Sequence, residues 1–289
     1  MNGAQSSLLA DGRRLHLHHG PIDLIVEVIG TGRDQSYARA IARFQNVLDE
    51  LVSELTQLRT RGRFGTAFAG TVARRMQTAI SSYCDQFVTP MAAVAGSVAD
   101  DILQHICDGD SVQKAYVNNG GDIAFYLSPG QEFVAALASV PGGRATLCYQ
   151  SGYGGIATSG WRGRSFSLGI ADAVTVVARD AANADVAATL IANAVDLPDC
   201  PEIERTEARI VAPDSDLGDL LVTTAVGTLT DAQIRRALDR GKTVATKLVR
   251  RGLVGAVCLQ LCDVTDQVGS LALKSSDLQS QQFQELSHA

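Results

Sequence analysis

The order of helix-like and strand-like segments is the feature that most restricts how this chain can fold. Apolar residues recur at spacings of three and four over residues 37–58, and further helical patterns follow up to residue 107. After Gly109 the pattern changes to short β-branched and aromatic runs, separated by Gly-Gly, Ser-Pro-Gly and Pro-Gly-Gly turns. Segments grouped in this way, rather than alternating strand with helix, predict an α+β fold with antiparallel or mixed sheets packed against helices.

Several elements can be placed individually. Residues 14–30 predict two consecutive strands, because their β-branched and leucine residues are interrupted at Gly20-Pro21. Helices are expected over 183–195, with Asn183 at or near the N-cap, and from about 230 to 251, followed by a strand over 253–264. We predict one domain spanning residues 1–274 and a polar, disordered tail at residues 275–289.

Composition excludes several classes of protein. With 289 residues, 46% of them hydrophobic, the chain is globular rather than intrinsically disordered. The net charge of −6 disfavours nucleic acid as a partner, because duplex binding needs a basic face. No stretch approaches the roughly 20 apolar residues that cross a bilayer, so no membrane partner is expected. The first residues lack the layout of a signal peptide, and the six cysteines form no C-x-x-C pair, so a cytoplasmic protein with reduced thiols is expected.

The apolar stripe over residues 37–58 and a mean hydropathy of +0.07 also bear on assembly. One layer of structure would leave part of this apolar surface uncovered. We therefore expect a homodimer or a larger homo-oligomer, although packing within a single fold would satisfy the same stripe.

Three Gly- and Asx-rich segments are candidates for ligand binding. In the first, paired glycines would let the backbone approach a ligand, although an ordinary hairpin turn has the same composition. The second places small hydroxyl side chains near the only tryptophan. In the third, Asp185 and Thr189 share one helical face and could present oxygens to Mg²⁺, or Asp185 could simply complement the helix dipole. The candidate ligand-binding residues of the first two segments are Asn118, Asn119, Gly120, Gly121, Asp122, Thr158, Ser159 and Gly160.

Acid–base and thiol chemistry has few candidates. His16 and His18 alternate onto one face of the first long strand pattern and could act in catalysis or bind a metal. A surface role for both histidines is the competing interpretation. Cys148, near the second Gly-rich segment, is the best candidate for a thiol nucleophile, and burial in a strand is the alternative.

Read in order, the motifs resemble those of the ApbE superfamily, the flavin transferases that move FMN from FAD to a protein threonine. The matching segments are residues 89–100, Asn-Asn-Gly-Gly-Asp-Ile at 118–123, Ala-Thr-Ser-Gly at 157–160 and Ala-Asp-Val-Ala-Ala-Thr at 184–189. This resemblance implies the superfamily's α+β fold, with Asp185 and Thr189 as the metal-binding pair.

Longer segments resemble an uncharacterised bacterial and archaeal branch of that superfamily. They include GPIDLIVE, TPMAAVAGSVAD, SFSLGIADAVTVVA, SDLGDLLVTTAVG and GLVGAVCLQL. This second resemblance spans most of the chain, and no activity of the branch can be carried over.

Two departures separate the chain from flavin transferases. The region after Gly160 reads WRGRSFSLGIADAV and lacks the H-x-x-D-P-x-T-G motif, and Ala95 replaces a lysine. We therefore expect an enzyme that acts on a small polar ring compound or a nucleotide-like cofactor, assisted by Mg²⁺, without transferring FMN. The alternative is a non-catalytic flavin or pterin carrier, or an assembly protein.

Overall fold

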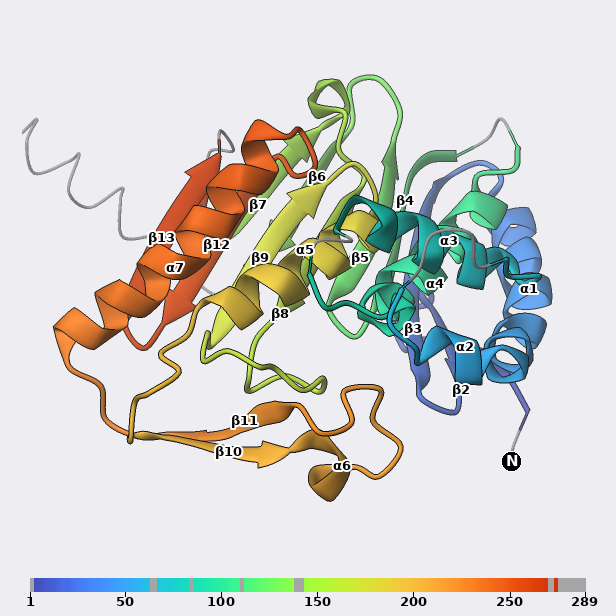
Figure 1. The fold of residues 1–289 in the computed structure, drawn as a ribbon. Helices are drawn as coiled ribbons and strands as arrows, with labels where there is room; N and C mark the ends of the chain where they lie inside the picture. Colours follow the sequence, from blue (N-terminus) through green and yellow to red (C-terminus); the bar gives the residue numbers. More distant parts are fainter. Residues whose placement is uncertain are drawn as a thin grey trace, which may run out of the picture.

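The computed structural model describes residues 3–62, 67–83, 86–109, 112–137, 143–269 and 273–274. Its centre is a nine-stranded sheet in which every neighbouring pair is antiparallel (Figure 1). In spatial order the strands are β1 (Gln5–Leu8), β2 (Leu15–His19), β3 (Ile22–Gly30), β4 (Val112–Asn119), β5 (Asp122–Leu127), β8 (Gly155–Ser159), β9 (Ala173–Ala178), β12 (Ala256–Leu261) and β13 (Val264–Gly269).

Helices cover one face of this sheet (Figure 1). From one end to the other, α1 packs on β2 and β3, α4 on β4 and β5, α5 on β8 and β9, and α7 on β12 and β13. The long helices are α1 (Arg33–Ser53), α3 (Thr71–Ile80), α4 (Val94–Ile106), α5 (Ala181–Ala194) and α7 (Asp231–Arg250). Shorter ones are α2 (Leu55–Leu58), α6 (Ala208–Val211) and the 3₁₀ turns Ser81–Tyr83, Pro90–Ala93 and Tyr149–Ser151.

The opposite face is partly covered by a small antiparallel sheet of β6 (Glu132–Ala136), β7 (Arg144–Cys148) and β14 (Leu273–Lys274). Phe133 of β6 stacks on Phe125 of the main sheet, with ring centroids 4.9 Å apart, and Leu147 packs in the same cluster. Because both of its faces are covered, β9 is buried along its whole length.

A two-stranded arm consists of β10 (Ile203–Glu207), β11 (Leu221–Val226), α6 and the loop 212–220 (Figure 1). Arg205 fixes the arm to the body, donating to the Leu168 carbonyl and pairing with Asp196. The Thr223 N–H donates to the Ser167 carbonyl. The arm thereby lies against the loop that follows β8.

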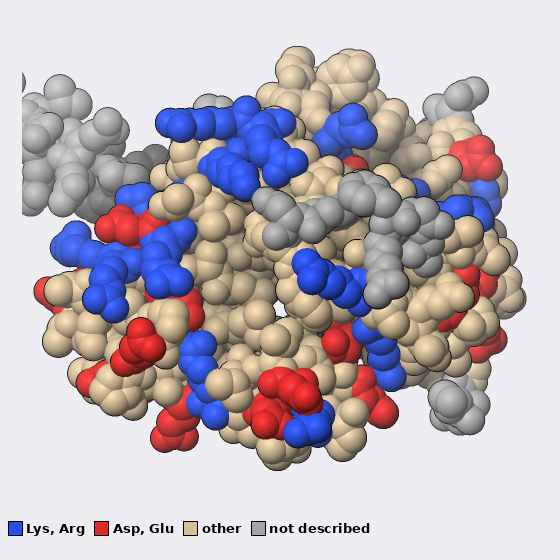
Figure 2. Space-filling model, viewed as in Figure 1, with Lys and Arg blue, Asp and Glu red and all other residues tan. Residues whose placement is uncertain are grey.

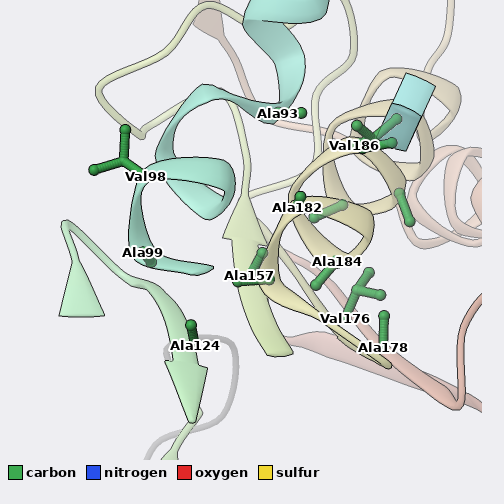
Figure 3. Close-up of a cluster of buried hydrophobic side chains, with 14 of the residues drawn as sticks. Ala93, Val98, Ala99, Ala124, Ala157, Val176, Ala178, Ala182, Ala184 and Val186 are labelled. Carbon is green, nitrogen blue, oxygen red and sulfur yellow. The ribbon is translucent and has the colours of Figure 1, made fainter. Parts of the chain in front are cut away.

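Small side chains dominate the core where α4 and α5 cross the sheet (Figure 3). Gly96 of α4 packs directly on α5, and a Cβ at this position would lie 2.3 Å from the Ala181 carbonyl oxygen. Gly155 of β8 makes a similar approach, because its Cβ would lie 2.1 Å from the backbone of Asp180. The two helices therefore sit closer to each other and to the sheet than larger residues would permit.

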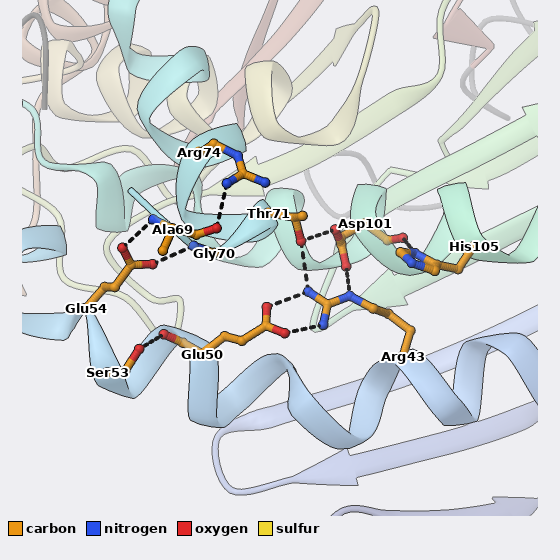
Figure 4. Close-up of polar contacts among 10 residues, drawn as sticks. All are labelled: Arg43, Glu50, Ser53, Glu54, Ala69, Gly70, Thr71, Arg74, Asp101 and His105. Atoms are coloured by element: carbon orange, nitrogen blue, oxygen red, sulfur yellow. Dashed lines mark hydrogen bonds and ion pairs between the residues drawn. The ribbon is translucent and has the colours of Figure 1, made fainter. Parts of the chain in front are cut away.

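A partly buried polar network ties α1 to α3 and α4 (Figure 4). Arg43 pairs with Asp101 at 2.6 Å and with Glu50 at 2.7 Å, and Thr71 donates to Asp101. Glu54 accepts the N–H groups of Ala69 and Gly70, where α3 begins. These carboxylates accept hydrogen bonds from the N–H groups at the start of α3 and from the largely buried guanidinium of Arg43, so the network stabilises the helix layer.

The predicted α+β class is confirmed, and residues 14–30 form the two strands β2 and β3. The stripe over 37–58 is divided at Glu54 between α1 and α2. Asn183 was expected at or near the N-cap of α5; the cap itself is Asp180, three residues earlier, and its side chain accepts the Asn183 N–H. Thr230 caps α7 in a capping box with Gln233. The predicted tail at 275–289 lies outside the described residues. None of the described helices combines the length and apolar character needed to span a bilayer.

Candidate functional site

A cavity of about 270 Å³ opens on the helix side of the sheet, between the starts of α4 and α5, the loop 160–170 and the arm. Asp122, Asp185, Thr189 and Arg164 line it, together with Thr89 and Asp216. We call it the helix-side cavity. In the space-filling view this face is hollowed near its centre, above the arm (Figure 2). Thr89 donates a hydrogen bond to Asp216, which joins the arm loop to the segment before α4.

Asp185 and Thr189 lie one turn apart on α5, on the shared face that their spacing predicted. Asp185 Oδ2 accepts the N–H of Gly96 at 3.0 Å, and the Ala95 N–H also bonds this carboxylate. Asp185 is therefore placed by the N-terminus of α4, not by the start of its own helix. The competing interpretation placed Asp185 at the dipole of its own helix, whereas its hydrogen bond complements the N-terminus of the neighbouring helix α4.

The two helices cap each other. Asp100 of α4 accepts the N–H groups of Ala181 and Ala182 at 3.0 and 2.9 Å, at the start of α5. Asp185 of α5 does the same for the start of α4. Each carboxylate satisfies backbone donors that have no partner within their own helix. This reciprocal capping depends on the close contact at Gly96 and fixes the Asp185 carboxylate at the cavity wall.

The acidic groups around this crossing affect one another. Burial raises the pKa of Asp122 to about 7, against the lowering effects of the Thr158 N–H and the Arg164 charge. Burial, and then the charge of Asp122, raise the pKa of Asp185 well above its ordinary value. Burial and the charge of Asp180 raise the pKa of Asp100 to about 7. Asp122 and Asp185 are thus close enough to repel each other when both are ionised, and a cation between them would relieve that repulsion.

Arg164 occupies the rim of the cavity. Its guanidinium lies on Gly120, where a Cβ would be 1.6 Å from Nη2. Gly120 also has a left-handed φ of +64°, so the β4–β5 turn needs glycine for its conformation and for the space above it. Arg164 lies in the segment WRGRSFSLG, where the flavin-transfer motif is missing.

The remaining predicted residues of the Gly-rich segments lie on both sides of the sheet. Asn118, Gly120, Gly121, Thr158, Ser159 and Gly160 line a second, larger hollow of about 720 Å³ on the far face, beside Tyr116 and Phe133. We call it the far-face hollow. Asn119 points the other way, is buried and donates to the Ala95 carbonyl at 3.1 Å. Side chains alternate along a strand, which separates Asn118 from Asn119 and Asp122 from Ile123. The predicted single pocket is therefore two cavities that share no lining residue, and a third, shallow hollow at the β4–β5 turn shares Arg164 with the first and Gly120 and Gly121 with the second.

The histidine and thiol candidates lie away from the helix-side cavity. His16 and His18 share one face of β2 as predicted, with ring centroids 6.3 Å apart, and His16 Nε2 contacts Asp23 at 3.1 Å. Asp23 lines a shallow hollow beneath Arg164, so the histidines reach the rim only indirectly. Cys148 ends β7, opposite Glu132 of β6. None of the three lines the helix-side cavity.

The sequence reasoning missed Arg164, Thr89 and Asp216. Thr89 and Asp216 lie 127 residues apart and touch only because the arm folds back over the body. Arg164 lies in the segment after Gly160, which stood out in the sequence only because it lacks the H-x-x-D-P-x-T-G motif. The segments containing Thr89 and Asp216 resemble the uncharacterised branch, and that resemblance was the available signal.

Oxygen donors suited to a hard cation meet in the helix-side cavity, from Asp122, Asp185 and Thr189. In the part of the chain that the structure describes, no group of three or more His, Cys, Asp or Glu side chains is arranged to hold a metal. These three residues fit a partly hydrated Mg²⁺, whose other ligands are water and substrate oxygens. They do not fit a closed structural metal site.

These features define an α+β protein with a carboxylate-lined cavity where two helices cap each other. The sequence profile of the family described as "AbpE bacteria" matches residues 6–272, and the chain belongs to this family. The resemblance to the ApbE superfamily is thereby confirmed.

Curated relatives are named UPF0280 proteins. That of Methanothermobacter thermautotrophicus is 34% identical over 164 residues, which are 53% of this chain and 62% of that protein. That of Archaeoglobus fulgidus is 37% identical over 130 residues, which are 45% of this chain and 54% of that protein. The chain spans about half the length of the relatives it matches.

Two solved structures are similar in overall outline. The flavin transferase ApbE from Vibrio cholerae has a TM-score of 0.47 and 12% identity, covering 89% of this chain and 97% of that one. The ApbE protein from Thermotoga maritima has a TM-score of 0.43 and 10% identity, covering 96% and 98%.

Proposed function

We propose that this protein is a Mg²⁺-assisted transferase or hydrolase that acts on a small polar ring compound or nucleotide-like cofactor, and that it does not transfer FMN. The observation that carries the proposal is the meeting of Asp122, Asp185 and Thr189 in one cavity. One strand and one helix that are far apart in the sequence, β5 and α5, supply these oxygens, and the reciprocal capping of α4 and α5 fixes the Asp185 carboxylate. A site built this rigidly suits positioning of a substrate group for reaction.

Each residue has a distinct role in this proposal. Asp185 and Thr189 hold the cation from α5, and Asp122 faces it from the β4–β5 turn. The bound cation would orient and polarise a phosphoryl or carbonyl oxygen of the substrate. Thr89 and Asp216 join the arm to the body over the cavity, which limits the access of water.

Metal titration of matched variants tests the proposal. Mn²⁺, a paramagnetic substitute for Mg²⁺, is titrated into the full chain and followed by electron paramagnetic resonance. We expect Asp185→Asn and Thr189→Val to weaken Mn²⁺ binding by about tenfold or more, because a neutral amide or a methyl group is a poor ligand for a hard cation. Asp180→Asn is the control, since Asp180 is the N-cap of the same helix α5, asparagine caps a helix as well as aspartate does, and Asp180 does not line the cavity. Equal Mn²⁺ affinity in Asp185→Asn and the wild type would contradict the proposal.

A second candidate function is supported by the far-face hollow. It is larger than the helix-side cavity and carries the rings of Tyr116 and Phe133 beside the Asn118–Gly121 turn. This lining suits a flat flavin or pterin ring held without turnover. Native mass spectrometry of freshly purified protein separates the two functions. A stoichiometric flavin or pterin that survives incubation with Mg²⁺ would favour a carrier, whereas a chemically altered ligand would favour the enzyme.

A further inference from the structure

We propose that Arg164 binds an oxyanion of the substrate, a carboxylate or a phosphate, at the rim of the helix-side cavity. This inference rests on the proposed function and adds the chemical class of the substrate. The ligand would be an acid whose anionic group lies beside the part held at Asp185 and Thr189. Three observations about Arg164 carry the inference.

The first observation is the charge of the lining. Among the described residues that line the helix-side cavity, Arg164 is the one cationic side chain, while Asp122, Asp185 and Asp216 are acidic. The charge of Arg164 lowers the pKa of Asp122, but within the described residues the two side chains form no direct ion pair. An acidic substrate would meet repulsion from the carboxylates wherever Arg164 did not compensate for it. We therefore expect an anionic group of the substrate to bind beside Arg164 in the helix-side cavity.

The second observation is that the guanidinium has donors to spare. In the described part of the chain, Arg164 makes no hydrogen bond or ion pair, although Arg162 two residues earlier pairs with Asp172 at 2.8 Å. Asp23 lines the same shallow hollow but forms no ion pair with Arg164 within the described residues. A guanidinium presents five N–H donors in a planar fork that matches carboxylate and phosphate oxygens. The fork is thus available to an incoming ligand.

The third observation is the space that Gly120 leaves beneath the Arg164 guanidinium, which we call the glycine seat. Gly120 makes room for the guanidinium, whose Cζ lies 2.6 Å from the position that a Cβ would take. Arg164 lines the helix-side cavity and also the shallow hollow with Asn118 and Gly121, at the turn between β4 and β5. A glycine at this point leaves space for the guanidinium over the turn, while the arginine as a whole remains exposed and accessible to a ligand.

Three probes test the inference by calorimetry on the full chain at constant ionic strength: inorganic phosphate, phenyl phosphate and benzoate. The two aromatic probes distinguish a phosphate from a carboxylate carried on a ring. We expect at least one probe to bind the wild type, and Arg164→Gln to weaken its binding roughly ten- to a hundredfold. Arg164→Lys should weaken it less, because the charge remains and the fork is lost. Arg235→Gln, at an exposed position on α7, is the charge control and should leave binding unchanged.

A glycine pair tests the glycine seat separately. Gly120→Ala should displace Arg164 and weaken probe binding, whereas Gly12→Ala should not. Gly12 has the same φ of +64° and nothing within 4 Å of its would-be Cβ, so it reproduces the backbone strain without touching the arginine. Equal probe binding by Gly120→Ala and Gly12→Ala would show that the space at Gly120 plays no part in positioning Arg164 for binding.

The probe and Mn²⁺ experiments give different outcomes when this inference fails and when the proposed function fails. If the wild type binds Mn²⁺ but the probes bind equally to Arg164→Gln, or do not bind at all, the inference is wrong and the metal site stands. If Mn²⁺ does not bind while probe binding depends on Arg164, the metal site is wrong and the inference stands. Arg164→Gln itself should bind Mn²⁺ at least as tightly as the wild type, since a repelling positive charge is gone.

Discussion

The substitution Gly96→Ala tests the helix crossing on which the cavity depends. A Cβ at position 96 would lie 2.3 Å from the Ala181 oxygen, 2.5 Å from the Ala181 carbonyl carbon and 2.8 Å from the Ala182 nitrogen. All three are backbone atoms of α5, so no side chain can rotate away. Relief requires α4 and α5 to separate by about 1 Å, given ordinary contact distances near 3.5 Å.

The energetic cost follows from what this separation disturbs. Overpacking of a close contact costs about 1–3 kcal/mol. Separation also strains the bond from the Gly96 N–H to Asp185, and a hydrogen bond to a charged group contributes about 1.5–3 kcal/mol. Replacing a helical glycine by alanine returns about 1 kcal/mol of helix propensity. The net expectation is a loss of about 2–4 kcal/mol, which for a chain of this length corresponds to a Tm lower by roughly 3–7 °C.

Urea unfolding and Mn²⁺ titration measure the two consequences together. Ser97→Ala is the matched control, since Ser97 is the next residue of α4, is fully buried, and its hydroxyl has no hydrogen-bond partner in the described structure. The control should be neutral or slightly stabilising. Gly96→Ala should lose stability and also Mn²⁺ affinity, because Asp185 moves with the crossing. A Gly96→Ala protein as stable as the wild type would refute the reasoning, because the higher helix propensity of alanine would then offset the whole cost of the contact with α5.

The remaining predictions concern pH, chemistry and assembly. Asp100 has a folded pKa of about 7, above its ordinary 3.8, so the folded state favours the protonated acid. The contribution of Asp100 to the stability of the metal-free protein is therefore fully present below pH 4 and is lost as pH rises through 7, so the free energy of unfolding of the wild type measured in urea should fall relative to that of Asp100→Asn over this range. Incubation with FAD, Mg²⁺ and a threonine acceptor peptide should give no FMN adduct by intact-mass analysis, because the H-x-x-D-P-x-T-G motif and the lysine at Ala95 are missing; an adduct would overturn this. Light scattering should give at least twice the chain mass of 30.5 kDa, and a mass of one chain across micromolar concentrations would contradict the expected oligomer.

Local patterns in the sequence determined much of the fold. Alternation over residues 14–30 specifies β2 and β3, and the Thr230–Gln233 pair specifies the start of α7, because strand alternation and helix capping depend only on neighbours in the chain. The same holds for Asp185 and Thr189, whose spacing of four places both on one face of α5. The family resemblance was also readable, since it rests on short motifs in order.

Tertiary structure decided toward which face of the main sheet each motif directs its side chains. Asn118 and Asn119 are adjacent in the sequence, yet one lines the far-face hollow and the other is buried against Ala95. Asp100 caps α5 and Asp185 caps α4 only because glycine at position 96 lets the helices touch, a contact across 85 residues of chain. Arg164 reaches the rim only because Gly120 leaves space for it. Packing between distant segments has no local sequence pattern, so the cavity could be assembled only in three dimensions.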